Sequence, residues 1–261
     1  MMRYLMPAVL AFALSVSTVA ASEEGDEDEA FHPTPPIQES WSWNGIFGTY
    51  DRDQILRGLE IFTGQCINCH SLKYIHFRDL MQIGLSEDEA EALAEQFEVS
   101  GDPDEWGDPT TRAAKLFDGF PAPYRNEQEA VALNNGIVPP DLSLMAKARP
   151  DGSNYIASLL SDEHYNQGNL NENGLYDNQY FIGGGEIVMA PPLYLGLLVN
   201  SDGTDASVDE MAADIAAFLT WTAEPRLEDR KGMGLKVILF LLVLTGLLYV
   251  CKRKIWANVE H

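Results

Sequence analysis

The sequence is poor in cysteine and in positive charge. Only three of its 261 residues are Cys, so there is no second cysteine pair to complete a zinc site built on two such pairs. Lys and Arg number 17 against 40 Asp and Glu, and the net charge is -23 at pH 7. Nucleic-acid phosphates repel such a surface, so DNA or RNA binding is not expected. A basic protein is the complementary partner. Residues 79–108 carry no Lys or Arg and form either a solvated acidic face or a docking surface.

Long hydrophobic runs are also scarce, and the first of the two lies at the N-terminus. Arg3 precedes the apolar stretch "LMPAVLAFALSVSTVA", and small residues stand at 19–21. This order is typical of a secretory signal peptide, predicted here to be residues 1–21. A retained anchor is the alternative, but the run is short and acidic residues follow it. Residues 22–40 are acidic and then rich in proline, and we expect this segment to be extended or flexible.

The second hydrophobic run, residues 233–251, predicts a transmembrane helix. It carries one charge, Lys236, near its edge, and its length is sufficient to cross a bilayer. A core helix is the alternative, but core helices are rarely apolar on every side. The sequence "KRK" follows at once, which predicts that the tail, residues 252–261, stays in the cytoplasm. We therefore expect a domain at 41–228 in the periplasm, held by a single span in the bacterial inner membrane.

The domain between these runs shows no internal repeat and little alternation of apolar residues, which predicts a mainly α fold. The segment 101–150 is rich in Gly and Pro and predicts loops with short helices and no sheet. Two of the expected helices begin with a capping-box pattern, Ser86 with Glu89 and Ser207 with Glu210. Helices are expected at 51–62, 86–98, 155–165 and 207–221.

The motif "CINCH" combines Cys66, Cys69 and His70. Cys251 lies at the inner end of the predicted anchor and cannot reach this pair. C-x-x-C-H in an exported chain is typical of c-type haem attachment. The two thiols add to the two vinyl groups at one edge of the haem, and the turn between them brings both sulfurs to that edge. The adjacent histidine then supplies one nitrogen to the iron.

Three other interpretations of the motif were considered. A thioredoxin-like redox pair opens a helix after a strand, whereas here a helix is expected before Cys66. A zinc site needs two further ligands, and only His76 is close in sequence. A plain disulfide between Cys66 and Cys69 is the third. The export signal and the preceding helix favour haem over all three.

The second iron ligand is less clear from the residues alone. Methionine opposite histidine is common in electron-transfer haems and raises their reduction potential. We set aside the methionines in the predicted signal, the one beside the anchor, the one too near His70 in sequence and the one on the apolar face of an expected helix. Met145 and Met189 remain. Met189 lies in "GGGEIVMAPP", where glycines and prolines can present one side chain rigidly. Three histidines are rival ligands: His32, His76 and His164.

Four segments resemble one family. They are "RGLEIFTGQCINCHSLKY", "FPAPYRNEQEAVALNNGIVPPDLSLMAKAR", "VMAPP" and "FLTWTAEPRLEDRKGMGLK". Together they are similar to the cytochrome c1 family, the haem subunits of quinol–cytochrome c reductase (cytochrome bc1) complexes, in its bacterial form. C-x-x-C-H is shared by c-type cytochromes in general, whereas the "NNGIVPPDLS" segment and the junction with the anchor are far more specific. The resemblance implies a cytochrome c-like helical haem domain with long loops and one C-terminal transmembrane helix.

The resemblance also implies roles for single residues. Cys66 and Cys69 would bind one haem covalently, and His70 and Met189 would ligate its iron. Arg149 would pair with a haem propionate. The other positions that match the family's haem pocket are Asn134, Pro139, Pro140, Leu142, Tyr155, Leu159 and Leu160. Residues 162–185 lack the paired cysteines that some relatives carry, so no disulfide is expected to brace the loop before Met189.

The implied function is electron transfer inside a bc1 complex. Single electrons would pass from the Rieske iron–sulfur protein to a basic cytochrome c, while quinol is oxidised elsewhere, with cytochrome b. The family implies a homodimer of the whole complex. A free-standing, membrane-anchored electron shuttle is the alternative, and a thiol–disulfide or structural protein without haem is the third. Association with b-type haem separates the first two, and any haem absorption excludes the last.

Overall fold

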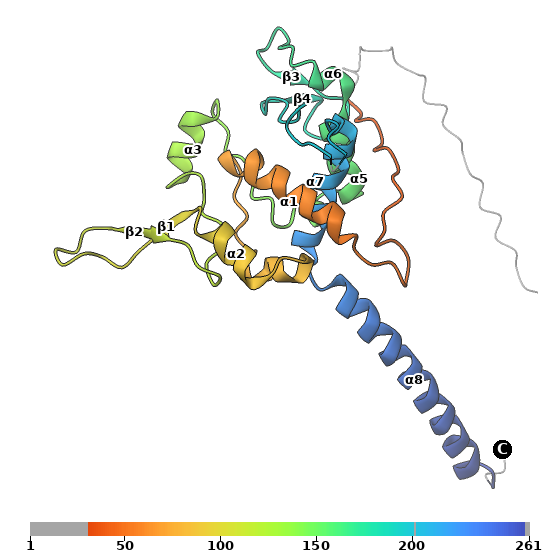
Figure 1. The fold of residues 1–261 in the computed structure, drawn as a ribbon. Coiled ribbons are helices and arrows are strands. Elements are labelled where there is room, and N and C mark those ends of the chain that lie inside the picture. The colour runs from red at the N-terminus through yellow and green to blue at the C-terminus, as the bar shows by residue number, and fades with distance from the viewer. Residues whose placement is uncertain (1–30, 201, 259–261) are drawn as a thin grey trace, which may run out of the picture. The chain divides into compact units, whose positions relative to one another are not determined.

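The computed structural model describes residues 31–200 and 202–258 (Figure 1). The predicted signal peptide, 1–21, and the acidic part of the segment at 22–40 lie outside these residues. The described part is mainly helical, as predicted, with two short β ladders. Its elements are α1 Arg52–Gly64, η1 Cys66–Asn68, η2 Phe77–Ile83, α2 Glu87–Ala94, β1 Glu98–Ser100, β2 Thr111–Ala113, α3 Glu127–Leu133, α4 Met145–Ala148, α5 Gly152–Ser161, α6 Glu163–Asn166, β3 Tyr176–Asp177, β4 Glu186–Ile187, α7 Val208–Ala223 and α8 Leu227–Ile255.

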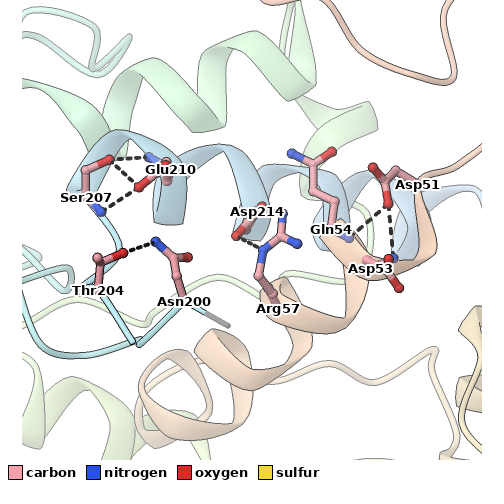
Figure 2. Close-up of polar contacts among 9 residues, drawn as sticks. All are labelled: Asp51, Asp53, Gln54, Arg57, Asn200, Thr204, Ser207, Glu210 and Asp214. Atoms are coloured by element: carbon pink, nitrogen blue, oxygen red, sulfur yellow. Dashed lines mark hydrogen bonds and ion pairs between the residues drawn. The ribbon is translucent and has the colours of Figure 1, made fainter. Parts of the chain in front are cut away.

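The ends of the two central helices follow local sequence signals. The side chain of Asp51 accepts hydrogen bonds from the first free backbone N–H groups of α1, which have no partner inside the helix. Ser207 and Glu210 form the predicted capping box at the start of α7, and Figure 2 shows both caps. The predicted box of Ser86 and Glu89 is also confirmed, at the start of α2. The two capping boxes are local, which is why the sequence predicted them.

Helices α1 and α7 cross at very close range. A Cβ on Gly58 would lie 2.2 Å from the backbone oxygen of Asp214 and 2.6 Å from Cβ of Phe218, so only glycine permits this approach. Beside the crossing, Arg57 donates two hydrogen bonds to the Asp214 carboxylate, at 2.7 and 2.8 Å (Figure 2). The bidentate pair and the missing side chain at position 58 together fix how α1 lies on α7.

The hydrophobic core surrounds this crossing. Met211, Ile215 and Phe218 of α7 are at most 1% exposed, which confirms the apolar face expected for this helix. The rings of Phe62 and Phe218 are 5.5 Å apart, and Phe62 also packs edge-on against Phe120. Because α1 ends at Gly64, directly before the C-x-x-C-H motif, this core gives the motif a rigid support.

Three predictions on secondary structure need correction. The segment 101–150 was expected to contain no strand, but β2 pairs antiparallel with β1, with Val99 opposite Arg112. A three-residue ladder is too short to produce a readable alternation. The helix expected at 86–98 ends at Ala94, and the one expected at 155–165 is divided. At the division Asp162 adopts an extended backbone and its carboxylate caps α6.

Helix α8 contains the second hydrophobic run. It is 29 residues long, Leu227–Ile255, and by length and composition it could cross a membrane. At 1.5 Å per residue it extends about 44 Å, more than the hydrocarbon thickness of about 30 Å. The helix therefore begins before the apolar run, and its first turns belong to the folded domain.

Candidate functional site

The two motif cysteines lie on a tight turn that directly follows α1. The backbone N–H groups of Cys69 and His70 both donate to the carbonyl of Cys66, at 3.1 and 2.9 Å. Both cysteines are free thiols, Cys66 half-buried and Cys69 exposed. Burial raises the pKa of Cys66 to about 12. The turn predicted from the C-x-x-C spacing is present, and it presents two free thiols and a histidine from one short segment.

The ring of His70 is oriented by a backbone carbonyl. Its Nδ1 lies 2.8 Å from the carbonyl oxygen of Pro140. A carbonyl can only accept, so Nδ1 carries the proton and Nε2 keeps its lone pair. Burial lowers the pKa of His70, which favours the neutral ring. A neutral imidazole with one nitrogen hydrogen-bonded and the other free is the form in which histidine binds metals.

The segment that supplies the Pro140 carbonyl is bound along its length to the chain after His70. The backbone N–H of Leu142 donates to the carbonyl of Ser71 at 2.9 Å. The Asp141 carboxylate accepts from the Ser71 hydroxyl at 2.7 Å and from the Lys73 N–H at 3.1 Å. Ser143 Oγ accepts from the N–H of Tyr74 at 3.1 Å. Sequence analysis selected Pro139, Pro140 and Leu142 from "PPDLS" but missed Asp141 and Ser143.

The other motif cysteine is near a second predicted residue. The Tyr124 hydroxyl donates to the side-chain oxygen of Asn134 at 3.1 Å and lies beside the Cys69 thiol; burial and that thiol raise the pKa of Tyr124. The Asn134 amide donates to the carbonyl of Ala130 at the end of α3. The structure therefore brings Asn134 to Cys69 through Tyr124, a residue that sequence analysis did not select.

Met189 is held through its backbone. The hydroxyl of Tyr165 donates to the carbonyl of Met189 at 2.9 Å, and the Tyr165 side chain is 1% exposed. Farther back in the same loop, Asn178 donates from its side chain to the carbonyl of Leu159 at 2.8 Å. These bonds brace a loop that has no cysteine. The rival methionine, Met145, begins the short helix α4, and both methionines pack against the core.

Two of the rival histidines have other partners. His76 Nδ1 lies 3.5 Å from the carboxylate of Asp79, and His164 Nε2 lies 3.8 Å from that of Asp177. His32 is exposed in the N-terminal segment.

Arg149 and Tyr155 form a further group. Burial raises the pKa of Tyr155, although the nearby Arg149 guanidinium favours its ionised form. Tyr155 is 4% exposed and Leu160 is 8% exposed on α5, while Leu159 is half-buried. The guanidinium and the phenol together suit an anionic group. The contacts given above do not join all the residues predicted for the haem pocket. They form separate groups around His70, Cys69, Met189 and Arg149.

The apolar side chains near Pro140 are unusually exposed. In the segment 133–144 the exposed fractions are 68% for Leu133, 49% for Ile137, 43% for Val138 and 46% for Leu144. Two thiols, a neutral histidine and this apolar segment are the donors and surroundings that a covalently bound haem needs. Over the described residues there is no group of three or more His, Cys, Asp and Glu that could hold a metal ion.

Comparison with known proteins agrees with the motifs. The model of the Cytochrome C1 family matches residues 41–259. The cytochrome c1 of Rhodospirillum rubrum is 44% identical in an alignment that covers 86% of this chain and 88% of that protein. The "Cytochrome b-c1 complex catalytic subunit, mitochondrial" of Candida albicans is 42% identical over 89% of this chain and 81% of its own length. A mitochondrial "Cytochrome c1, heme protein" of Neurospora crassa is also 42% identical, over 91% of this chain and 71% of its own length. The chain belongs to the cytochrome c1 family.

Proposed function

We propose that this chain is the membrane-anchored haem subunit of a bc1-type complex, and that it carries single electrons from a Rieske iron–sulfur protein to a cytochrome c. The observation that carries the proposal is the hydrogen bond from His70 to the Pro140 carbonyl. It leaves Nε2 free and oriented next to two free thiols. The names of the relatives, which include a subunit of the cytochrome b-c1 complex, support the same assignment.

The residues have distinct roles in this proposal. Cys66 and Cys69 hold one haem through thioether bonds, which prevent its loss in an open compartment. His70, through Nε2, and Met189, through its sulfur, would ligate the iron. When bound, the haem supplies the one-electron redox couple, and the protein supplies ligation, burial and electrostatics. Arg149 and Tyr155 bind a propionate. Tyr124 and Asn134 lie beside Cys69 and line the pocket together with Pro139, Leu142, Leu159 and Leu160.

The net charge and the membrane anchor indicate the docking partner and the location of the chain. The acidic surface attracts a basic cytochrome c, and salt weakens such an attraction. Helix α8 spans the inner membrane with the basic residues after 251 in the cytoplasm. The haem domain then lies in the periplasm beside cytochrome b, where quinol is oxidised, and the assembly is a homodimer of the complex.

An optical experiment tests the assignment. The full chain, tagged at its C-terminus, is purified from gently solubilised membranes, and spectra are recorded after ascorbate and then after dithionite. A c-type band with ascorbate, joined by b-type bands with dithionite, is expected for a bc1 subunit. A c-type band without b-type haem in every mild detergent would instead support a free-standing shuttle. The absence of any haem band would refute both.

A substitution tests the second ligand. Met189→Leu keeps the size of the side chain but removes the sulfur. We expect a lower midpoint potential and carbon monoxide binding to the reduced protein. Met145→Leu is the matched control and should leave both properties unchanged. The opposite pattern would assign the ligand to Met145, and no change in either variant would assign it to a histidine.

A further inference from the structure

A short loop at residues 44–48 exposes two large apolar side chains at its tip. Ile46 is 71% exposed and Phe47 is 79% exposed. The loop is tightly closed, since a Cβ on Gly48 would lie 2.1 Å from the carbonyl oxygen of Asn44. Only glycine can occupy that position, so the sequence builds a compact loop with an apolar tip.

The base of this loop is packed into the folded domain. The rings of Trp41 and Trp43 stack with centroids 4.8 Å apart, and Trp43 also packs against Tyr50 at 5.5 Å. Trp41 Nε1 donates to the side-chain oxygen of Asn154 in α5 at 2.7 Å. All three aromatic side chains are less than 10% exposed, at 8%, 7% and 6%. The exposure of the tip is therefore set by a rigid base.

The loop is also bound to the first turns of α8. Lys231 Nζ donates to the carbonyls of Trp43 and Gly48, one at each end of the loop. Glu228 accepts from the backbone N–H of Tyr50 at 2.7 Å and pairs with Arg52 at 2.6 Å. Three side-chain contacts thus join the loop and its base to the segment from which the apolar run begins.

The position of Lys231 sets the level of the loop relative to a membrane. The apolar run begins at Met233, two residues later, and its one charge, Lys236, lies five residues later. At 1.5 Å per residue, the ends of the loop lie about 3–8 Å before the hydrocarbon begins. The headgroup layer on each side of a bilayer is about 5–8 Å thick. The loop therefore starts inside that layer.

We propose that the tip of this loop, Ile46 and Phe47, inserts into the lipid headgroup region of the membrane that α8 spans. The proposal rests on the membrane anchoring proposed for α8. Apolar and aromatic side chains at this level are favourable because they enter the boundary between headgroups and acyl chains, where their apolar surface is removed from water. Nearby charges from Arg52, Glu228 and Lys231 are mixed, so the surface does not exclude a lipid headgroup.

The insertion fixes the orientation of the haem domain. A single helix leaves a domain free to tilt and rotate about its junction with the membrane. A second contact at the loop tip, joined to α8 through Lys231, restricts that motion. The site around His70 would then be held at a constant height and direction, which matters for partners that also lie on or in the membrane.

Photo-crosslinking from the full chain in its native membranes tests the proposal. Benzoylphenylalanine replaces Phe47 in one variant and Trp106 in the control, since Trp106 is 82% exposed in the connection between β1 and β2. We expect phospholipid adducts by mass spectrometry at position 47, in about tenfold excess over position 106. Adducts of position 47 with protein alone, an equal lipid yield at both positions, or no adduct at position 47 would overturn the proposal.

Two further variants separate the steps of the argument. The same cross-linker at Leu241, within the apolar run of α8, reports whether the helix lies in lipid at all. Lipid adducts at Leu241 without any at Phe47 refute the loop contact and leave the anchor intact, whereas their absence at Leu241 refutes the anchor. Lys231→Met removes the bond between helix and loop but keeps the length of the side chain. It should reduce the lipid yield at position 47 severalfold, and an unchanged yield would show that Lys231 does not hold the loop at this level.

Discussion

Replacing Tyr165 by Phe isolates the hydrogen bond that holds the Met189 loop. The ring is 1% exposed and packs edge-on against Tyr176 at 6.2 Å, so Phe keeps the packing and removes only the hydroxyl. The Met189 carbonyl then loses its 2.9 Å partner. The Met189 carbonyl is part-buried, so leaving it unsatisfied costs at most the about 1–3 kcal/mol of a buried acceptor. If this cost falls on the state in which Met189 is bound to the iron, the detached state becomes at most roughly 5- to 150-fold more populated, since 1.4 kcal/mol is tenfold.

The assay is carbon monoxide binding to the reduced, haem-loaded protein, together with its midpoint potential. Tyr165→Phe should bind carbon monoxide faster than the unchanged protein and more slowly than Met189→Leu, with a potential between the two. Tyr176→Phe is the matched control because it retains the hydroxyl of Tyr165. Wild-type binding and potential in Tyr165→Phe would refute the role of this hydrogen bond. An equal effect in Tyr176→Phe would point to the packing of the loop instead.

Three other predictions concern stability and docking. Gly58→Ala should lower the free energy of unfolding by about 1–3 kcal/mol in denaturant titrations, because the added methyl group meets the α7 backbone; an unchanged or higher stability would show that the helices can separate freely. Burial raises the pKa of Asp141, but hydrogen bonds from Ser71, Ser143 and Lys73 outweigh it and leave the pKa lowered. The Asp141 contribution is therefore present above the ordinary pKa of about 3.9 and is lost as pH falls below it. Asp141→Asn should be less stable at neutral pH and should lose less stability on acidification, and parallel pH profiles for the two proteins would contradict this. Electron transfer to a basic cytochrome c should slow as ionic strength rises, and a flat dependence would exclude electrostatic docking.

Much of the fold was predictable because its signals are local. The caps of α1, α2 and α7 involve residues within three positions of one another, and their side chains and backbone partners meet as soon as the helix forms. The turn from Cys66 to His70 is local in the same way. The ladder of β1 and β2 was missed because each strand has only three residues, and its pairing depends on the connection between them.

The side chains that could bind a haem were predictable from the sequence, whereas the residues that hold them in position were not. Cys66, Cys69 and His70 follow from their types and spacing, and the family resemblance selected Met189 over Met145. The assignments of Cys66 and Cys69 as haem-binding residues and of His70 and Met189 as iron ligands stay predictions. Tyr124, Asp141 and Tyr165 were missed because their importance depends on what they contact, and nothing in their own neighbourhoods distinguishes them from ordinary polar residues.

By itself, the sequence determined the C-x-x-C-H turn, the helix ends and an apolar run of membrane-spanning length, since each depends on residues a few positions apart. Only the tertiary structure decided the contacts that join distant segments. His70 meets the Pro140 carbonyl across 70 positions, Tyr165 meets that of Met189 across 24, and Lys231 meets that of Trp43 across 188. The acceptor in each is a backbone carbonyl, a group that every residue carries. No side-chain pattern marks which carbonyl will be used, and packing of the core selects it.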